Sequence, residues 1–345
     1  MSLTAEQILD QSKQESQTMV DKILSAKTAV VTAHVNPDGD TLGSMLALAK
    51  VLEQAGVKRV DRVMHDPVPD IYKFFPDQDK VKCSQESTEA LLEEYDLSFS
   101  CDCGSIKRLG SAGEVWQRAK TTCNVDHHLS NPLYADLNWV DPNATCTGQV
   151  VKELAAALKQ AGKNIETDAE LASLYYITLL TDTGGFMHSN TTGKVFAWAA
   201  ELIEQGANPS KLYHGLFNQM PFRAIKVIGA ALDKLELIEV KPGLKLAYTY
   251  TLRSELAELE AKDEDTDEIV DHIMRIKEIQ ACLYLREAKV DGHYKGSLRS
   301  AIPELDCSVL ASQLNGGGHA RAAGFNLDAE SLDDLKATVL ELLRN

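Results

Sequence analysis

Short apolar runs alternate with amphipathic segments through the first half of the chain. The apolar runs are rich in β-branched residues and end in polar or glycine-containing loops, which is typical of buried strands. These predicted strands lie near 28–34, 58–64, 96–101, 122–126 and 137–140. Helical periodicity predicts helices near 5–25, 41–54, 106–119, 146–161 and 168–180. Such alternation favours an α/β fold, in which a mainly parallel sheet carries helices on both faces.

Residues 191–237 break this alternation, because almost all of them fit helical periodicity. Helices are predicted over 193–205, 209–217 and 221–237, and Pro209 and Pro221 occupy positions suited to helix starts. A helical segment between two α/β patterns is typical of a connector between domains.

Strand patterns return near 244–251, 279–287 and 293–299, and helices near 306–314 and 330–343 flank a run of glycines. This half therefore predicts a smaller α/β domain with a mixed sheet. The resulting domain division has three parts: a first domain over 1–205, a helical connector over 206–237 and a second domain over 238–345.

Composition and charge narrow the functional classes. The chain has 345 residues, 44% of them hydrophobic, and no apolar run reaches about 18 residues, so we expect no membrane span. The formal net charge of −16 disfavours binding of long duplex nucleic acid and favours a small substrate, although acidity can also reflect a merely solvated surface. The chain start lacks the pattern of a secretory signal, and the seven cysteines are scattered, which predicts reduced thiols in the cytoplasm.

Acidic and histidine side chains follow several of the predicted strands. Because the carboxyl ends of parallel strands meet at one edge of a sheet, we expect these side chains to converge. Taken singly, such an Asp is commonly a cap or turn residue, and a His pair is commonly structural. Together they suit divalent metal ions. The candidates are His34, Asp38, Asp40, Asp102, Asp126, His127, His128 and Asp182.

The pattern resembles the DHH phosphoesterase superfamily over essentially the whole chain, and within it the NrnA-like branch of oligoribonucleases and 3′-phosphoadenosine-5′-phosphate (pAp) phosphatases. The resembling motifs are His34-Val35-Asn36-Pro37-Asp38-Gly39-Asp40, Asp102, Asp126-His127-His128 and Asp182-Thr183-Gly184. The resemblance implies one metal ion held by His34, Asp38 and Asp102, and a second held by Asp40, Asp102, His127 and Asp182.

Charge matching agrees with two ions, because four carboxylates balance two divalent cations. Carboxylate and imidazole ligands favour Mn²⁺, with Mg²⁺, Fe²⁺ and Co²⁺ as alternatives. Asp126 is then expected to orient a histidine, and His128 to face the substrate phosphate as a hydrogen-bond donor or general acid.

The second domain carries a glycine run that resembles the signature of the DHH-associated C-terminal domain. Consecutive glycines can present backbone N–H groups to an anion, although a flexible loop has the same composition. Strand alternation places Lys295, Ser297 and Arg299 on one face of a nearby strand, which is either a phosphate-binding element or simply exposed. The predicted substrate-binding residues are Ser297, Arg299, Gly316, Gly317, Gly318 and His319.

These features predict a metal-dependent phosphodiesterase that cleaves short RNA oligomers or linear dinucleotides and can also dephosphorylate pAp. The alternatives are a cyclic-di-AMP or pApA phosphodiesterase, a pyrophosphatase or polyphosphatase, and a nucleotide-binding module without activity. Gln149 stands where relatives often carry an acid, so rate or preference can differ here. The helix over 5–25 is either a homodimer interface or a cap on the domain core.

Overall fold

The computed structural model describes residues 3–86 and 91–344, without the side chain of His319. The chain divides into two compact units, Met1–Gln219 and Met220–Asn345. The division between the units falls inside the stretch 206–237 that the sequence predicts as a connector. No helix in the described ranges is long and apolar enough to cross a membrane.

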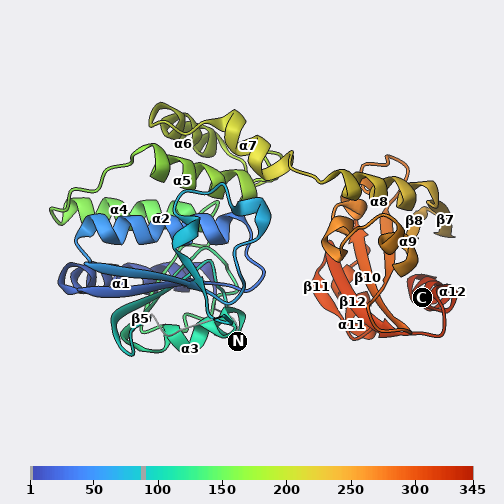
Figure 1. The fold of residues 1–345 in the computed structure, drawn as a ribbon, viewed down its shortest axis with the longest axis horizontal. Helices are drawn as coiled ribbons and strands as arrows, with labels where there is room; N and C mark the ends of the chain where they lie inside the picture. Colours follow the sequence, from blue (N-terminus) through green and yellow to red (C-terminus); the bar gives the residue numbers. More distant parts are fainter. Residues whose placement is uncertain (1–2, 87–90, 345) are drawn as a thin grey trace. The chain divides into compact units, whose positions relative to one another are not determined.

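A sheet runs through the middle of unit 1 (Figure 1). It has six strands in the order β3-β2-β1-β4-β5-β6, and every neighbouring pair is parallel. Its core strands are buried on both faces, as expected for a parallel sheet covered by helices. The strands are β1 (Thr28–Ala33), β2 (Arg59–Met64), β3 (Val81–Cys83), β4 (Tyr95–Cys101), β5 (Ala119–Asp126) and β6 (Leu137–Val140).

Helices cover both faces of this sheet. On one face α1 (Ala5–Ser25), α2 (Gly39–Ala55), α4 (Thr147–Gln160) and α5 (Ala169–Asp182) enclose the larger core, and α6 (Gly193–Glu204) and α7 (Pro209–Phe217) pack outside α5. On the other face α3 (Ala112–Trp116) packs against β1, β2 and β4. Helix α1 buries Ile8, Met19, Val20 and Ile23 within unit 1, so its apolar side caps the domain.

Unit 2 contains a mixed six-stranded sheet in the order β11-β12-β10-β9-β8-β7, in which only β8 and β9 pair in parallel. The strands are β7 (Glu236–Lys241), β8 (Leu244–Thr251), β9 (Ala281–Glu287), β10 (His293–Ser300), β11 (Gly317–His319) and β12 (Ala322–Asp328). One face packs against α8 (Phe222–Asp233), α9 (Arg253–Glu258) and α10 (Ile269–Ile273), and the other against α11 (Cys307–Gln313) and α12 (Leu332–Arg344).

Two predicted helices are wrong in their extent. The segment 106–119 forms a 3₁₀ turn, Ile106–Leu109, and the short α3, because Gly110 between them has a left-handed φ of 56°. The helix predicted over 221–237 ends at Asp233, and β7 begins at Glu236. The α/β class and the mixed sheet of unit 2 are confirmed.

A candidate metal centre and a cationic pocket

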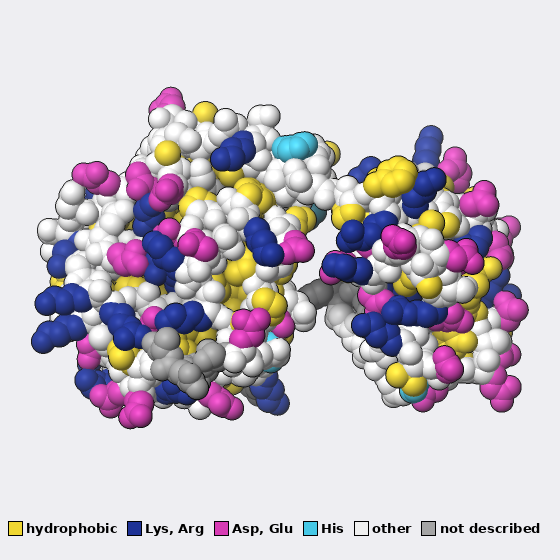
Figure 2. Space-filling model, viewed as in Figure 1, with side chains coloured by type: hydrophobic (Ala, Val, Ile, Leu, Met, Phe, Trp, Pro, Cys, Tyr) yellow, Lys and Arg dark blue, Asp and Glu magenta, His cyan; other side chains and the backbone are white. Residues whose placement is uncertain are grey.

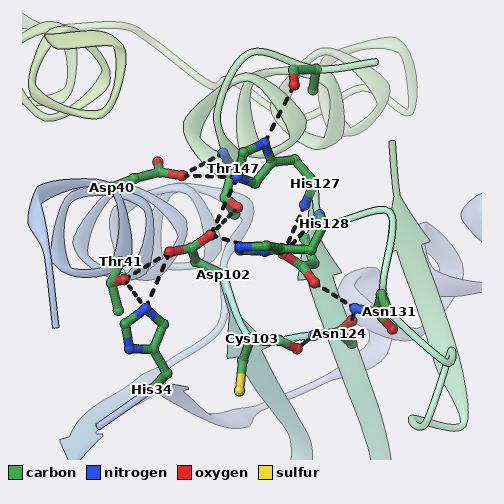
Figure 3. Close-up of polar contacts among 12 residues, drawn as sticks. His34, Asp40, Thr41, Asp102, Cys103, Asn124, His127, His128, Asn131 and Thr147 are labelled. Atoms are coloured by element: carbon green, nitrogen blue, oxygen red, sulfur yellow. Dashed lines mark hydrogen bonds and ion pairs between the residues drawn. The ribbon is translucent and has the colours of Figure 1, made fainter. Parts of the chain in front are cut away.

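The carboxyl edge of the unit 1 sheet gathers the predicted acidic and histidine side chains, of which Figure 3 labels His34, Asp40, Asp102, His127 and His128. His34 directly follows β1, Asp102 follows β4, and Asp126 ends β5. Asp38 caps the start of α2, where its carboxylate accepts a hydrogen bond from the Thr41 N–H. The centre is therefore assembled from strand ends and a helix start that the parallel sheet brings together.

Close helix packing brings Asp182 to the same edge. A Cβ atom at Gly39, the first residue of α2, would lie 2.2 Å from the Thr181 hydroxyl oxygen. Only glycine therefore allows the start of α2 to approach the end of α5, where Asp182 lies.

The first group of candidate ligands consists of His34, Asp38 and Asp102, whose donor atoms lie within 4.8 Å of one another. The Thr41 hydroxyl lies 2.6 Å from His34 Nε2, 2.7 Å from Asp102 Oδ2 and 2.9 Å from Asp38 Oδ1. His34 Nδ1 lies 2.7 Å from the Val35 carbonyl oxygen, and because that oxygen only accepts, Nδ1 donates. This contact leaves Nε2 as the nitrogen that faces the group.

The second group consists of Asp40, His127 and Asp182, which satisfy the same 4.8 Å criterion. His127 Nε2 lies 3.1 Å from Asp182 Oδ2, 3.9 Å from Asp40 Oδ2 and 3.7 Å from Asp102 Oδ1. Nδ1 of His127 contacts the Ala144 carbonyl oxygen at 3.3 Å, so its Nε2 also faces inward. Asp102, a member of the first group, therefore lies next to the second group.

Electrostatics in this centre favour a bound cation. Burial, together with the charges of Asp182 and Asp102, raises the pKa of Asp40 well above its usual value. Burial and the neighbouring carboxylates Asp102 and Asp38 likewise raise the pKa of Asp182 to about 8. Burial also acts to raise the pKa of Asp102, but neighbouring histidines, His34 first, lower it to about 2. Because these carboxylates repel one another and the donors are oxygens and imidazole nitrogens, the residues fit divalent ions such as Mn²⁺.

His128 lies beside these groups but has a different partner. Its Nδ1 is 2.7 Å from Asp126 Oδ1, and this hydrogen bond raises the pKa of His128 to about 9. Asp126 is completely buried and also accepts from the His127 N–H and the Asn131 side-chain amide. The donor atoms of His128 also lie within 4.8 Å of those of Asp102 and His127.

Sequence patterns do not predict the contacts of three residues near the centre, Thr41, Thr147 and Gln149. The Thr41 hydroxyl joins the first group, and the Thr147 hydroxyl donates to Asp102 Oδ1 at 2.9 Å. The Thr147 N–H also donates to Asp40 at 2.7 Å, so the start of α4 holds that carboxylate. The signal for Thr147 is its place at the first position of a helix. Gln149 accepts a hydrogen bond from the Thr145 N–H, so its amide stabilises the loop before α4.

Unit 2 places Ser297 and Arg299 in a pocket of about 400 Å³ on the face of the sheet opposite α11 and α12. Ladder pairing aligns Ser297 with Gly324 of β12, and Gly324 with Gly317 of β11. A Cβ at Gly317 would meet no atom within 4 Å. Next to Ser297, the two glycines of this row leave the backbone of β12 and β11 uncovered by side chains.

The glycine run lies along and just before an edge strand. Cβ atoms at Gly316 and Gly318 would lie 2.2 Å and 2.6 Å from backbone oxygens of β12, so these two glycines allow the close pairing of β11. The predicted role of the His319 side chain lies outside the described residues.

Known protein families match a domain in each of the two units. Residues 28–179 match the DHH family N-terminal domain, and residues 243–345 match the DHHA1 domain. The bifunctional oligoribonuclease and PAP phosphatase NrnA of Thermus thermophilus is 30% identical over 96% of this chain and 94% of its own length. The Bacillus subtilis protein of the same name is 26% identical over 87% and 89%.

A solved structure also shares the fold. The exopolyphosphatase-related protein of Bacteroides fragilis superposes with a TM-score of 0.86 at 23% identity, covering 96% of this chain and 97% of its own. The chain belongs to the DHH family, as a phosphoester hydrolase that joins a DHH domain to a DHHA1 domain.

Proposed function

We propose that the protein hydrolyses short RNA oligomers and linear dinucleotides to mononucleotides, and that it also removes the 3′-phosphate of pAp. The reaction uses two divalent metal ions, and Mn²⁺ is the favoured ion. The observation that carries this proposal is the pair of adjacent three-ligand groups, His34, Asp38 and Asp102 beside Asp40, His127 and Asp182. The relatives named for oligoribonuclease and PAP phosphatase activity support the substrate class. When bound at such groups, divalent ions lower the pKa of an attacking water and neutralise charge on the phosphoryl group.

The residues of the chain supply the rest of the mechanism. Nδ1 of His128 is held by Asp126, so Nε2 is left to donate a hydrogen bond or a proton to the leaving oxygen. His34 and His127 each direct Nε2 inward through a contact of Nδ1 with a backbone carbonyl. In unit 2, Arg299, Ser297 and the exposed backbone at Gly317 bind substrate phosphate.

The surface supports a short substrate. On the face drawn in Figure 2, Lys and Arg side chains are intermixed with Asp and Glu side chains in each unit, and the net charge of the chain is −16. Long duplex nucleic acid needs a basic surface along its length, so a short nucleotide held by a few local cations fits better. The seven cysteines are buried and free, which suits a reducing cytoplasm, and a homodimer stays a prediction.

The test incubates the protein with Mn²⁺ and, separately, a 2–5-nucleotide RNA, pApA, cyclic-di-AMP, pAp and pyrophosphate. We expect mononucleotides from RNA and pApA, AMP from pAp, and intact pyrophosphate. Asp102→Asn removes the carboxylate of the first group that also contacts His127 of the second, and it should lower turnover at least 100-fold, because such residues act as a unit. Asp21→Asn, on the exposed side of α1, is the matched control. Cleavage of pyrophosphate alone, or full turnover by Asp102→Asn, would contradict the proposal.

A further inference from the structure

A chain of buried hydrogen bonds leads from the interior of unit 1 to His128. Asn131 is 2% exposed, and Asn124 and Asp126 are completely buried. The side-chain NH₂ of Asn131 donates to Asp126 Oδ2 at 2.5 Å and to Asn124 Oδ1 at 2.6 Å. Asp126 Oδ1 in turn accepts from Nδ1 of His128 at 2.7 Å. In Figure 3, Asn124 and Asn131 lie on the same side of the centre as His128.

The backbone fixes the orientation of the Asn131 amide. The Leu133 N–H donates to Asn131 Oδ1 at 2.8 Å, and the Asn131 N–H donates to the His128 carbonyl oxygen at 3.1 Å. Because Oδ1 accepts from a donor, the NH₂ group is the end of the amide that faces Asp126. Leu133 has a left-handed φ of 58°, which leucine rarely adopts, so this loop is closed at a cost in free energy.

Asn124 anchors the other end of the chain of hydrogen bonds. Its NH₂ group donates to Ser100 Oγ at 2.9 Å, to the Tyr134 hydroxyl at 3.1 Å and to the Cys103 carbonyl oxygen at 3.3 Å. The Tyr134 hydroxyl itself donates to the Cys103 carbonyl oxygen at 2.9 Å. Because the donors of Asn124 face these partners, its Oδ1 is left to accept from Asn131.

The two oxygens of Asp126 therefore have different partners. Oδ2 accepts from Asn131, whereas Oδ1 accepts from the His128 ring and from the His127 N–H at 2.8 Å. The terminal torsion of an aspartate is soft, so a carboxylate held at one oxygen can rotate. The Asn131 amide restricts this rotation and thereby the direction in which Nε2 of His128 points. Without Asn131, Oδ2 would lose a charge-assisted hydrogen bond while buried.

We infer that Asn131 is a positioning residue for proton transfer to the leaving oxygen, and that it acts through Asp126 on His128. In this step the attacking water oxygen bonds to phosphorus, and the bond from phosphorus to the leaving oxygen breaks. The Nε2 proton of His128 passes to the leaving oxygen, and the proton that the water loses to solvent balances the one that His128 takes up afterwards. The inference rests on the proposed function for the reaction, and it adds a residue that the sequence motifs do not include.

Nuclear magnetic resonance of the whole protein in EDTA tests the hydrogen bond without turnover. In ¹H–¹⁵N spectra the Nδ1–H proton of His128 is identified by its absence from His128→Gln. In Asn131→Ala this proton should exchange with solvent at least about 10-fold faster than in the wild type, because Asp126 is no longer held. Equal exchange in the two proteins would overturn the inference.

Asn138→Ala is the matched control for the loss of a buried amide. Asn138 also lies in unit 1 and is 1% exposed, but its NH₂ group donates to Glu15 and to the Ala135 carbonyl oxygen. This variant should keep the wild-type exchange of the His128 proton.

Turnover of pApA with Mn²⁺ tests whether the hydrogen bond contributes to catalysis. Asn131→Ala should lower kcat about 10- to 100-fold, whereas KM and the Mn²⁺ concentration for half-maximal rate should stay within about twofold of wild type. In a His128→Ala background the same substitution should cost at most about twofold more, because its effect passes through His128. A full further loss in that background would overturn the inference.

A better leaving group separates positioning from damage to the metal centre. The 4-nitrophenyl ester of thymidine 5′-monophosphate releases 4-nitrophenolate, which needs no proton to leave. Asn131→Ala should therefore slow hydrolysis of this ester by less than about threefold. Asn131→Ser keeps one hydroxyl donor and should lose less activity on pApA than Asn131→Ala does. Equal losses of Asn131→Ala on pApA and on the ester would contradict a role in leaving-group protonation.

These measurements also separate the inference from the proposed function. If the wild type hydrolyses pApA and Asn131→Ala does so at the same rate, the positioning role is wrong and the proposed function stands. If no nucleotide is hydrolysed but exchange of the His128 proton depends on Asn131, the proposed function is wrong and the positioning of His128 by Asn131 stands.

Discussion

At the scale of single residues, neighbouring glycines of the 316–318 run have different requirements. We expect Gly317→Ala to change the free energy of unfolding by less than about 0.5 kcal/mol, because its Cβ meets no atom within 4 Å. The added methyl group occupies the space where a phosphate approaches the backbone, so KM for pApA should rise several-fold. Gly316→Ala, whose Cβ would lie 2.2 Å from the Gly324 carbonyl oxygen, should instead cost about 1–3 kcal/mol of stability. Denaturant unfolding and steady-state kinetics measure both, and wild-type KM in Gly317→Ala would contradict the predicted contact.

Sequence patterns predict the charged residues of the centre better than the residues that hold them. His34 and Asp102 directly follow a strand and Asp126 ends one, so strand prediction alone places them at one edge. Thr41 and Thr147 are harder to find, because a hydroxyl contributes only within about 3 Å and its reach depends on where each helix begins. The direction of the His34 and His127 rings depends on backbone carbonyls, which no sequence pattern records.

At the scale of elements, five strands of the unit 1 sheet could be predicted from the sequence, because each contains a short apolar or β-branched run bounded by polar loops. The strands of the unit 2 sheet are harder to predict from the sequence. The run 236–241 directly follows a helix and has apolar residues at 237, 238 and 240, a spacing that helical periodicity also fits, so the sequence predicts that α8 continues through it. Glycine has a low strand propensity, so β11 and the start of β12 resemble a loop until their pairing is seen. Strand β3 has only three residues and carries no usable periodicity.

Close packing of α4 against α5 is an element-scale requirement of the metal centre. Gly148 is the second residue of α4, and its Cβ would lie 2.0 Å from the Thr178 hydroxyl oxygen of α5. Gly148→Ala should force the helices apart, cost about 1–3 kcal/mol and shift the N–H groups that hold Asp40. Chemical denaturation of unit 1 measures this cost. Gly229→Ala, in the interior of α8 with open space around its Cβ, should be neutral or stabilising. Equal stability of Gly148→Ala and wild type would show that the contact relaxes freely.

At the scale of the whole molecule, each unit has its own hydrophobic packing and supports its own kind of site. The core of unit 1 positions repelling carboxylates that suit metal ions, whereas unit 2 concentrates cations in a chain that is acidic overall. Separate cores also allow the units to unfold in separate transitions. A ligand that binds one unit should therefore stabilise that unit alone.

Mn²⁺ should raise the unfolding temperature of unit 1 and leave that of unit 2 unchanged. Bound cations remove the repulsion among Asp40, Asp102 and Asp182, and a ligand at 100 times its Kd stabilises the folded state by about 2.7 kcal/mol. For a unit of this size the shift corresponds to about 5–10 °C in calorimetry, comparing MnCl₂ with EDTA. Asp182→Asn removes one ligand and should reduce the shift, and the transition of unit 2 is the internal control. Equal shifts of both transitions would mean a general ion effect, and no shift in either would contradict a metal site at Asp102.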